Sequence, residues 1–102
     1  MTVFRLTQDA KTDLIEIRRY TLKHRGKEQS KKYLAELRQT LQLISESPKI
    51  GKKRPDVGSG VHSFAHASHV IYYLVTKQQL IVFCVLHQSM LPLSHLEERS
   101  IT

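Results

Sequence analysis

The first half of the chain places apolar residues at helical spacing. A short apolar stretch, Val3 to Leu6, predicts a strand, and Thr7 follows it as a residue type favoured at a helix N-cap. The next apolar positions recur every three or four residues from about Gln8 to Arg25, at Ala10, Leu14 and Ile17. Basic residues close this segment before Gly26, so both ends of a first helix are marked.

A second helix is predicted from about Lys27 to Ser45. Its apolar residues form one stripe, at Tyr33, Leu34, Leu37, Leu41 and Ile44. Pro48 ends the pattern because proline cannot continue a helix. The connection at Gly26 is so short that the two helices must fold back on each other as an antiparallel pair.

The second half of the chain changes from helical to β-type patterning. Residues 47 to 60 are rich in Gly, Pro and Ser and predict a loop. Three β-like runs follow, from Val61 to Ala67, from His69 to Thr76, and from Gln79 to His87. The gaps between them permit only hairpins, which predicts a three-stranded antiparallel meander. We expect one α+β domain over residues 1–102, with a C-terminal tail at 88–102.

The last two runs are apolar at every position instead of at alternate positions. Successive side chains of a strand point to opposite faces, so both faces of these strands need cover. One helical pair can cover only one face. We expect the tail and a second polypeptide to share the other face, while the alternative, that the tail and the loop suffice, stays open.

Charge and cysteine content narrow the class of protein. The chain has 102 residues and a formal net charge of +7, which favours an acidic partner without choosing among nucleic acid, protein and membrane surface. Cys84 is the one cysteine, so no intramolecular disulfide can form and a reducing compartment is expected. The longest apolar run, Leu80 to Leu86, is too short to span a bilayer. We therefore expect a cytoplasmic protein.

Candidate chemistry is sparse. His62 and His66 stand four residues apart on a predicted strand, about 13 Å, which is too far for two ligands of one zinc ion. We expect neither a metal nor a cofactor. The strongest electrostatic feature is the basic cluster in the loop, at Lys49, Lys52, Lys53 and Arg54. It suits phosphates or acidic side chains, and a merely solvated loop is an equally good interpretation.

The order of elements, in about a hundred basic residues, resembles the RelE/ParE toxin superfamily, and local motifs resemble ParE in particular. These motifs are Ser47-Pro48-Lys49-Ile50-Gly51-Lys52, Arg54-Pro55-Asp56-Val57-Gly58-Ser59-Gly60, Val61-His62-Ser63-Phe64, His69-Val70-Ile71-Tyr72-Tyr73, and Val85-Leu86-His87-Gln88-Ser89-Met90. Two positions depart from the ParE pattern: His62 stands where arginine is usual, and Leu91 where an acidic residue often occurs.

The resemblance implies the toxin of a type II toxin-antitoxin module. Such a toxin is encoded beside an antitoxin, usually of the ParD type, and forms a hetero-oligomer that contacts DNA only indirectly. Family members typically poison DNA gyrase by protein contact, with no catalysis of their own. The predicted target-contact residues are Lys52, Lys53, Arg54, His87 and Met90, and the predicted antitoxin-binding residues are Tyr72, Leu74, Phe83 and Val85.

Two alternatives remain at this point. A RelE-type ribosome-dependent ribonuclease needs a base and cations, for which the candidates are His87, Lys49, Lys52 and Arg54, with Glu46 as a further acid. An inactive family member, retained for antitoxin binding and regulation of its own operon, is suggested by His62 and Leu91.

Overall fold

The computed structural model describes residues 3–77 and 79–89. Its elements are β1 (Val3–Leu6), α1 (Gln8–Arg25), α2 (Lys27–Glu46), the 3-10 helix η1 (Pro48–Ile50), β2 (Lys52–Lys53), β3 (Val61–His66), β4 (His69–Val75) and β5 (Gln79–His87). The predicted helices and late strands are confirmed to within one or two residues. Most of the predicted tail, including Met90 and Leu91, lies outside the described residues.

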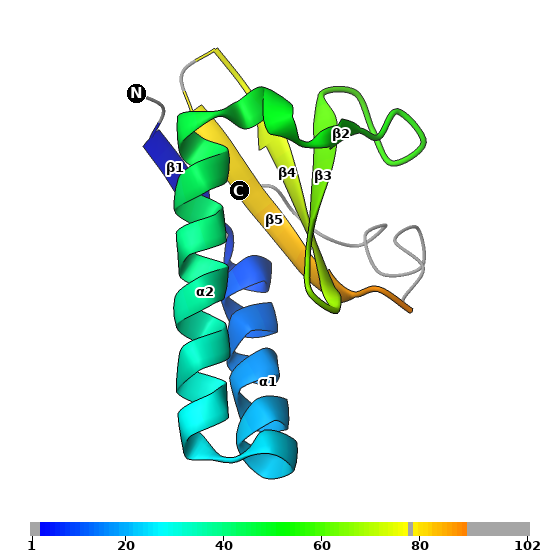
Figure 1. Cartoon of the computed structure of the whole chain (residues 1–102). Coiled ribbons are helices and arrows are strands. Elements are labelled where there is room, and N and C mark those ends of the chain that lie inside the picture. Colours follow the sequence, from blue (N-terminus) through cyan, green and yellow to red (C-terminus); the bar gives the residue numbers. More distant parts are fainter. Residues whose placement is uncertain (1–2, 78, 90–102) are drawn as a thin grey trace.

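All described strands belong to one sheet in the order β1-β5-β4-β3-β2 (Figure 1). The predicted meander of β3, β4 and β5 is confirmed as antiparallel. The N-terminal strand β1 pairs with β5 in parallel, and β2 pairs with β3 at the other edge. The prediction of an unstructured loop over residues 47 to 60 was therefore wrong in its first part, which forms η1 and the edge strand β2.

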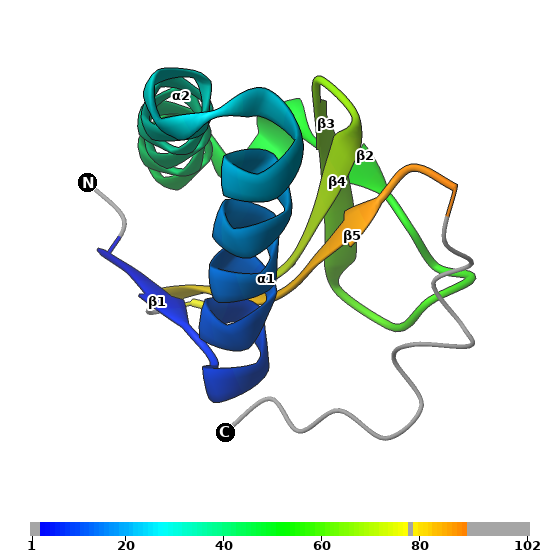
Figure 2. The same ribbon diagram turned by 90° about the horizontal axis from the view of Figure 1, so that it is seen from below.

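The two helices form the predicted antiparallel pair and lie on one side of the sheet (Figures 1 and 2). Thr7 is the N-cap of α1, because its hydroxyl accepts a hydrogen bond of 3.2 Å from the Ala10 amide. Gly26 turns the chain between the helices with φ 88°, a backbone conformation that glycine adopts without strain. The described part of the chain has no helix long and apolar enough to span a bilayer.

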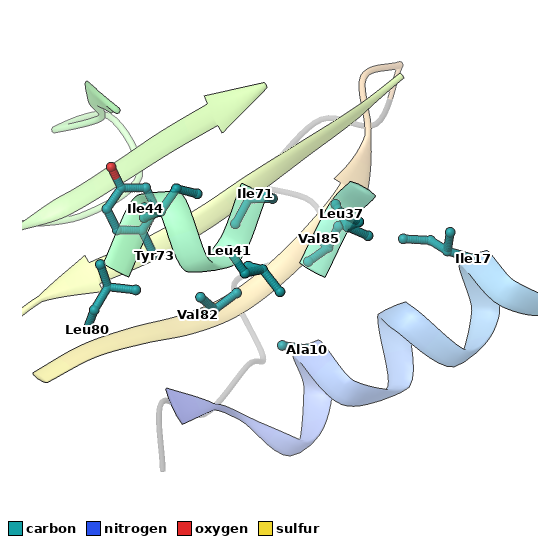
Figure 3. Packing of buried hydrophobic residues seen from close by; sticks show 10 residues of the cluster. All are labelled: Ala10, Ile17, Leu37, Leu41, Ile44, Ile71, Tyr73, Leu80, Val82 and Val85. Carbon is teal, nitrogen blue, oxygen red and sulfur yellow. The ribbon is translucent and has the colours of Figure 1, made fainter. Parts of the chain in front are cut away.

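A hydrophobic core lies between the helical pair and the sheet (Figure 3). It consists of Ala10, Ile17, Leu37, Leu41, Ile44, Ile71, Tyr73, Leu80, Val82 and Val85, all almost fully buried. The helix contacts are reinforced by a buried hydrogen bond of 2.7 Å between the hydroxyls of Thr21 and Ser30. Apolar burial therefore holds the helices against the sheet, and the hydroxyl pair joins the two helices to each other.

A β-bulge in β5 changes which face its side chains occupy. Tyr72 pairs with Cys84 and Tyr73 pairs with Val82, so Phe83 is the extra residue. Phe83 and Cys84 consequently both lie in a second cluster, on the face away from the helices, whereas Val85 faces the helices.

The second face of the sheet is screened within the single chain. Its cluster contains Val61, Tyr72, Phe83, Cys84 and Leu86, each no more than 6% exposed. Val57 packs against this cluster, and the Arg54 guanidinium lies 5.4 Å from the centre of the Tyr72 ring. These five residues are buried in the single chain, contrary to the expectation that a second polypeptide is needed to cover them. Most of the tail, which was expected to share this face, lies outside the described residues.

Candidate functional site

The segment that carries the loop lysines is held rigidly by Tyr73. The Tyr73 hydroxyl donates a hydrogen bond of 2.7 Å to the Pro48 carbonyl. Burial raises the pKa of this hydroxyl, an effect partly offset by a backbone hydrogen bond from Gly51, so the group stays protonated. Gly51 lies against the same hydroxyl, and a Cβ there would collide with it and lie 2.9 Å from the Ser63 carbonyl. The backbone between η1 and β2 is thus fixed by close packing.

The structure places four basic side chains along this end of the sheet: Lys49, Lys52, Lys53 and His62, called the basic edge below. All three lysines are exposed. A hollow of about 400 Å³ lies beside them, and its lining residues are Lys49, Gly51, Lys53, Gly60, His62 and Val75. None of these described lining residues is acidic, so the hollow is suited to an anion.

The Arg54 side chain differs from those of the neighbouring lysines because it forms hydrogen bonds with other side chains of the protein. Its guanidinium donates to both carboxylate oxygens of Asp56, at 3.1 and 2.9 Å, and a further contact of 3.4 Å reaches the Ser63 hydroxyl. The hydrogen bond to Asp56 is the main cause that raises the pKa of Arg54, and it lowers the pKa of Asp56. Arg54 therefore ties the loop to the second face, over Tyr72.

A larger cleft, of about 1010 Å³, lies at the other end of the sheet, where α1 and α2 meet the end of β5. Its lining combines apolar and charged side chains: Asp13, Glu16, Ile17, Tyr20, Thr21, Arg25, Gln29, Tyr33, Ala67, Ser68, His69, Val85, Leu86 and His87. Tyr20 is 61% exposed, an unusual amount for a large aromatic side chain. The cleft is a second candidate surface for a macromolecule.

Three histidines form one row across the sheet at this cleft: His66 pairs with His69, and His69 pairs with His87. The Tyr33 hydroxyl lies 2.6 Å from Nδ1 of His69 and donates a hydrogen bond of 3.4 Å to the His66 carbonyl. Burial lowers the pKa of the His69 imidazole. Positive charge on His87 and His66 lowers that pKa further. Tyr33 thereby joins α2 to the start of β4.

Comparison with known proteins identifies the family. Residues 4–92 match the family model described as ParE toxin of type II toxin-antitoxin system, parDE. The chain belongs to the ParE toxin family. It is 38% identical to Toxin ParE1 of Caulobacter vibrioides over 96 residues, which is 94% of this chain and 99% of that protein.

The toxin also shares its fold with a solved structure. The structure entitled Chromosomal ParDE TA system from P. aeruginosa superposes with a TM-score of 0.75 at 17% identity, and covers 85% of this chain and 96% of that one. At this identity the likeness is evidence for the fold alone, and it agrees with the predicted RelE/ParE-like architecture.

The predicted target-contact residues of the toxin do not form one surface. Lys52 on β2 is in register with Ser63 and, through it, with Tyr72 on β4, whereas His87 on β5 pairs with His69 on β4. Lys52 and His87 are therefore three residues apart along the strands and three strands apart across the sheet. These spacings put the two backbones roughly 17 Å apart. The structure therefore does not bring the loop lysines and His87 together. Met90 lies outside the described residues.

The same separation disperses the residues proposed for a ribonuclease. The candidate base His87 lies at the cleft, whereas the candidate cations Lys52 and Arg54 lie at the opposite corner. The candidate acid Glu46 ends α2 and accepts a hydrogen bond of 3.4 Å from Gln42. These residues, in this arrangement, do not form a single catalytic site.

The predicted antitoxin-binding residues also separate. Tyr72, Leu74 and Phe83 belong to the second cluster, and Val85 belongs to the core under the helices. Val85 lies apart from the other three because the bulge at Phe83 breaks the alternation along β5. Tyr72 and Phe83 are buried, so a partner reaches them only if their cover moves.

Sequence reasoning missed the cleft. The sequence pattern places Tyr33 only in the apolar stripe of α2, and the metal-ligand spacing of His62 and His66 does not point to this cleft. The signal that was present is the hairpin from His66 to His69, whose tight turn forces these two residues to be neighbours. Within residues 3–77 and 79–89, no three His, Cys, Asp or Glu side chains form a group able to hold a metal ion.

Proposed function

We propose that this ParE family toxin poisons DNA gyrase in the cytoplasm by protein contact, that it catalyses no reaction itself, and that a ParD-like antitoxin neutralises it. The observation that supports target contact is the basic edge. Its lysines are exposed, on η1 and on the short strand β2, and Tyr73 holds the Pro48 carbonyl at the start of this segment. The two ion pairs of the described residues involve other side chains. Such charges are free to meet an acidic surface.

Within the basic edge, Lys52 and Lys53 are the proposed target contacts. They lie at the end of the sheet order, with no further described strand beyond them. Arg54 supports these contacts indirectly, because its ion pair with Asp56 holds the loop that follows β2. His87 lines the cleft, so any contact that it makes with the target is separate from that of the basic edge.

The proposed antitoxin site is the cleft rather than the buried second face. A partner that binds there gains contact with the exposed Tyr20 ring, an aromatic side chain of the type enriched at protein interfaces. Acidic and basic groups occur together in the cleft, at Asp13, Glu16 and Arg25, which suits a partner segment of mixed charge. DNA contact by the resulting hetero-oligomer is assigned to the antitoxin.

Induction of the toxin gene alone tests the proposed target. Filamentation with DNA damage signalling is the result expected for gyrase poisoning. Abrupt arrest of translation would instead support the ribonuclease alternative, and unaffected growth would support the inactive alternative. Lys52→Gln with Lys53→Gln should weaken toxicity, whereas the control Lys31→Gln with Lys32→Gln removes equal charge from α2 and should not.

A binding assay tests the antitoxin site. Tyr20→Arg places a charge on the cleft surface and should weaken antitoxin binding at least tenfold, because burying an unpaired charge is costly. Leu43→Arg is the matched control, since Leu43 is 48% exposed on α2 and does not line the cleft. Equal effects of the two variants would refute the assignment.

A further inference from the structure

The side chains around the hollow at the basic edge are held in place by packing and hydrogen bonds, unlike those of a solvated loop. We propose that Lys49, Lys53 and His62 form a binding site for phosphate groups of a DNA backbone. This inference goes beyond the proposed function, because it assigns direct DNA contact to the toxin without gyrase or antitoxin.

Three separate elements contribute the side chains of this site. Lys49 comes from η1, Lys53 from β2 and His62 from β3, and all three line one hollow of about 400 Å³. Lys53 and His62 are direct partners in the strand register. Their convergence depends on the fold, since thirteen positions separate Lys49 from His62 in the sequence.

The site is fixed before a ligand arrives. The His62 ring stacks on Tyr73 with centroids 5.4 Å apart and planes 18° apart. Nδ1 of His62 lies 3.2 Å from the Gly60 carbonyl and donates to it, so Nε2 is left for another partner. Because Tyr73 also holds Pro48, one buried side chain positions both η1 and the imidazole. Preorganised groups lose less conformational freedom on binding.

The lining of the hollow suits the phosphate groups of a DNA backbone. Protein interfaces depend on apolar and aromatic groups at their centre. Val75 is the one large apolar residue among the described lining residues of the hollow. Gly51 and Gly60 also line the hollow. With no aromatic platform for bases in this lining, binding should be independent of DNA sequence.

The number of phosphate contacts can be measured from how DNA affinity depends on salt concentration. Each phosphate contact with B-DNA contributes about −0.9 to the slope of log affinity against log salt concentration. If Lys49 and Lys53 each make one contact, their removal should make the slope less steep by about 1.8. Between 50 and 200 mM salt this difference corresponds to about a twelvefold change in affinity.

Fluorescence anisotropy with the full-length toxin and a labelled 20-base-pair duplex measures this slope. The wild type should bind duplexes of unrelated sequence alike, and Lys49→Gln with Lys53→Gln should reduce the slope by about 1.8. Lys31→Gln with Lys32→Gln is the matched control. These residues lie on α2 near the hairpin turn, about 22 Å from the end of that helix next to η1 (Figure 1).

Two further arms make the test decisive. His62→Arg supplies a permanent cation and should strengthen binding severalfold, whereas His62→Gln should weaken it. Equal slopes for the two double variants would show general charge attraction and overturn the site, as would tighter binding to polyglutamate than to DNA. Gyrase is absent from this assay. A wild-type toxin that poisons gyrase but does not bind the duplex would therefore refute this inference and leave the proposed function intact.

Discussion

Gly51→Ala is the sharpest test of how the basic edge is held. The φ of Gly51 is −75°, which alanine adopts freely, so the cost of the substitution is steric. The added Cβ would collide with the Tyr73 hydroxyl and lie 2.9 Å from the Ser63 carbonyl, which cannot move without disturbing β3. Overpacking of this kind costs about 1–3 kcal/mol. Displacement of Tyr73 from the Pro48 carbonyl costs about 1 kcal/mol more.

We therefore expect Gly51→Ala to lower the free energy of unfolding by about 2–4 kcal/mol, a large part of the stability of a domain this size. Urea unfolding of the full-length chain, followed by circular dichroism, measures the change. Tyr73→Phe keeps the ring and removes only the hydrogen bond, so it should cost about 1 kcal/mol.

Gly58→Ala is the matched control for the same substitution. Its nearest neighbour is Cγ2 of Val61, which a Cβ would approach to 3.3 Å, and a small shift of that methyl group relieves the contact. The free energy of unfolding should change by less than about 0.5 kcal/mol. If Gly51→Ala is as stable as Gly58→Ala, the proposed packing around Tyr73 is wrong.

Two other predictions concern the cleft. Because the pKa of His69 is lowered below 6.5 in the folded state, the unfolded chain takes up the proton more readily, and the free energy of unfolding should fall as pH drops below 6.5. His69→Gln should reduce the difference between the urea midpoints at pH 7.5 and pH 5.5. An unchanged difference would contradict the assignment of this pH dependence to His69. Asp13 accepts a hydrogen bond of 2.9 Å from the Val85 amide, next to the bulge of β5. Asp13→Ala should lower the free energy of unfolding by about 1–3 kcal/mol, with faster exchange of the Val85 amide proton as the specific readout.

The helices were predictable because their signals are local. Thr7 before α1 and Gly26 after it mark both ends of this helix in the sequence. The apolar stripe of α2 continues to the last turn of the helix, which ends at Glu46. The strands β3 to β5 were predictable for a similar reason, since short turns separate runs of apolar residues. The family resemblance rested on these same segments, and the match over residues 4–92 confirms it.

The candidate site was less predictable because it depends on register and on one irregularity. Nothing in the sequence marks Phe83 as a bulge, yet this single residue decides which face Val85 occupies. The parallel pairing of β1 with β5 joins the two ends of the chain and leaves no local signal. The loop lysines were identified correctly as exposed, but their distance from His87 follows only from the strand order.

An in vitro DNA cleavage assay with purified gyrase tests the central claim most directly. If the toxin poisons gyrase through the basic edge, adding it to gyrase and supercoiled plasmid should accumulate cleaved, protein-linked DNA. Lys52→Gln with Lys53→Gln should reduce this product, and Lys31→Gln with Lys32→Gln should not. Full supercoiling activity with no cleaved product at any toxin concentration would contradict the account.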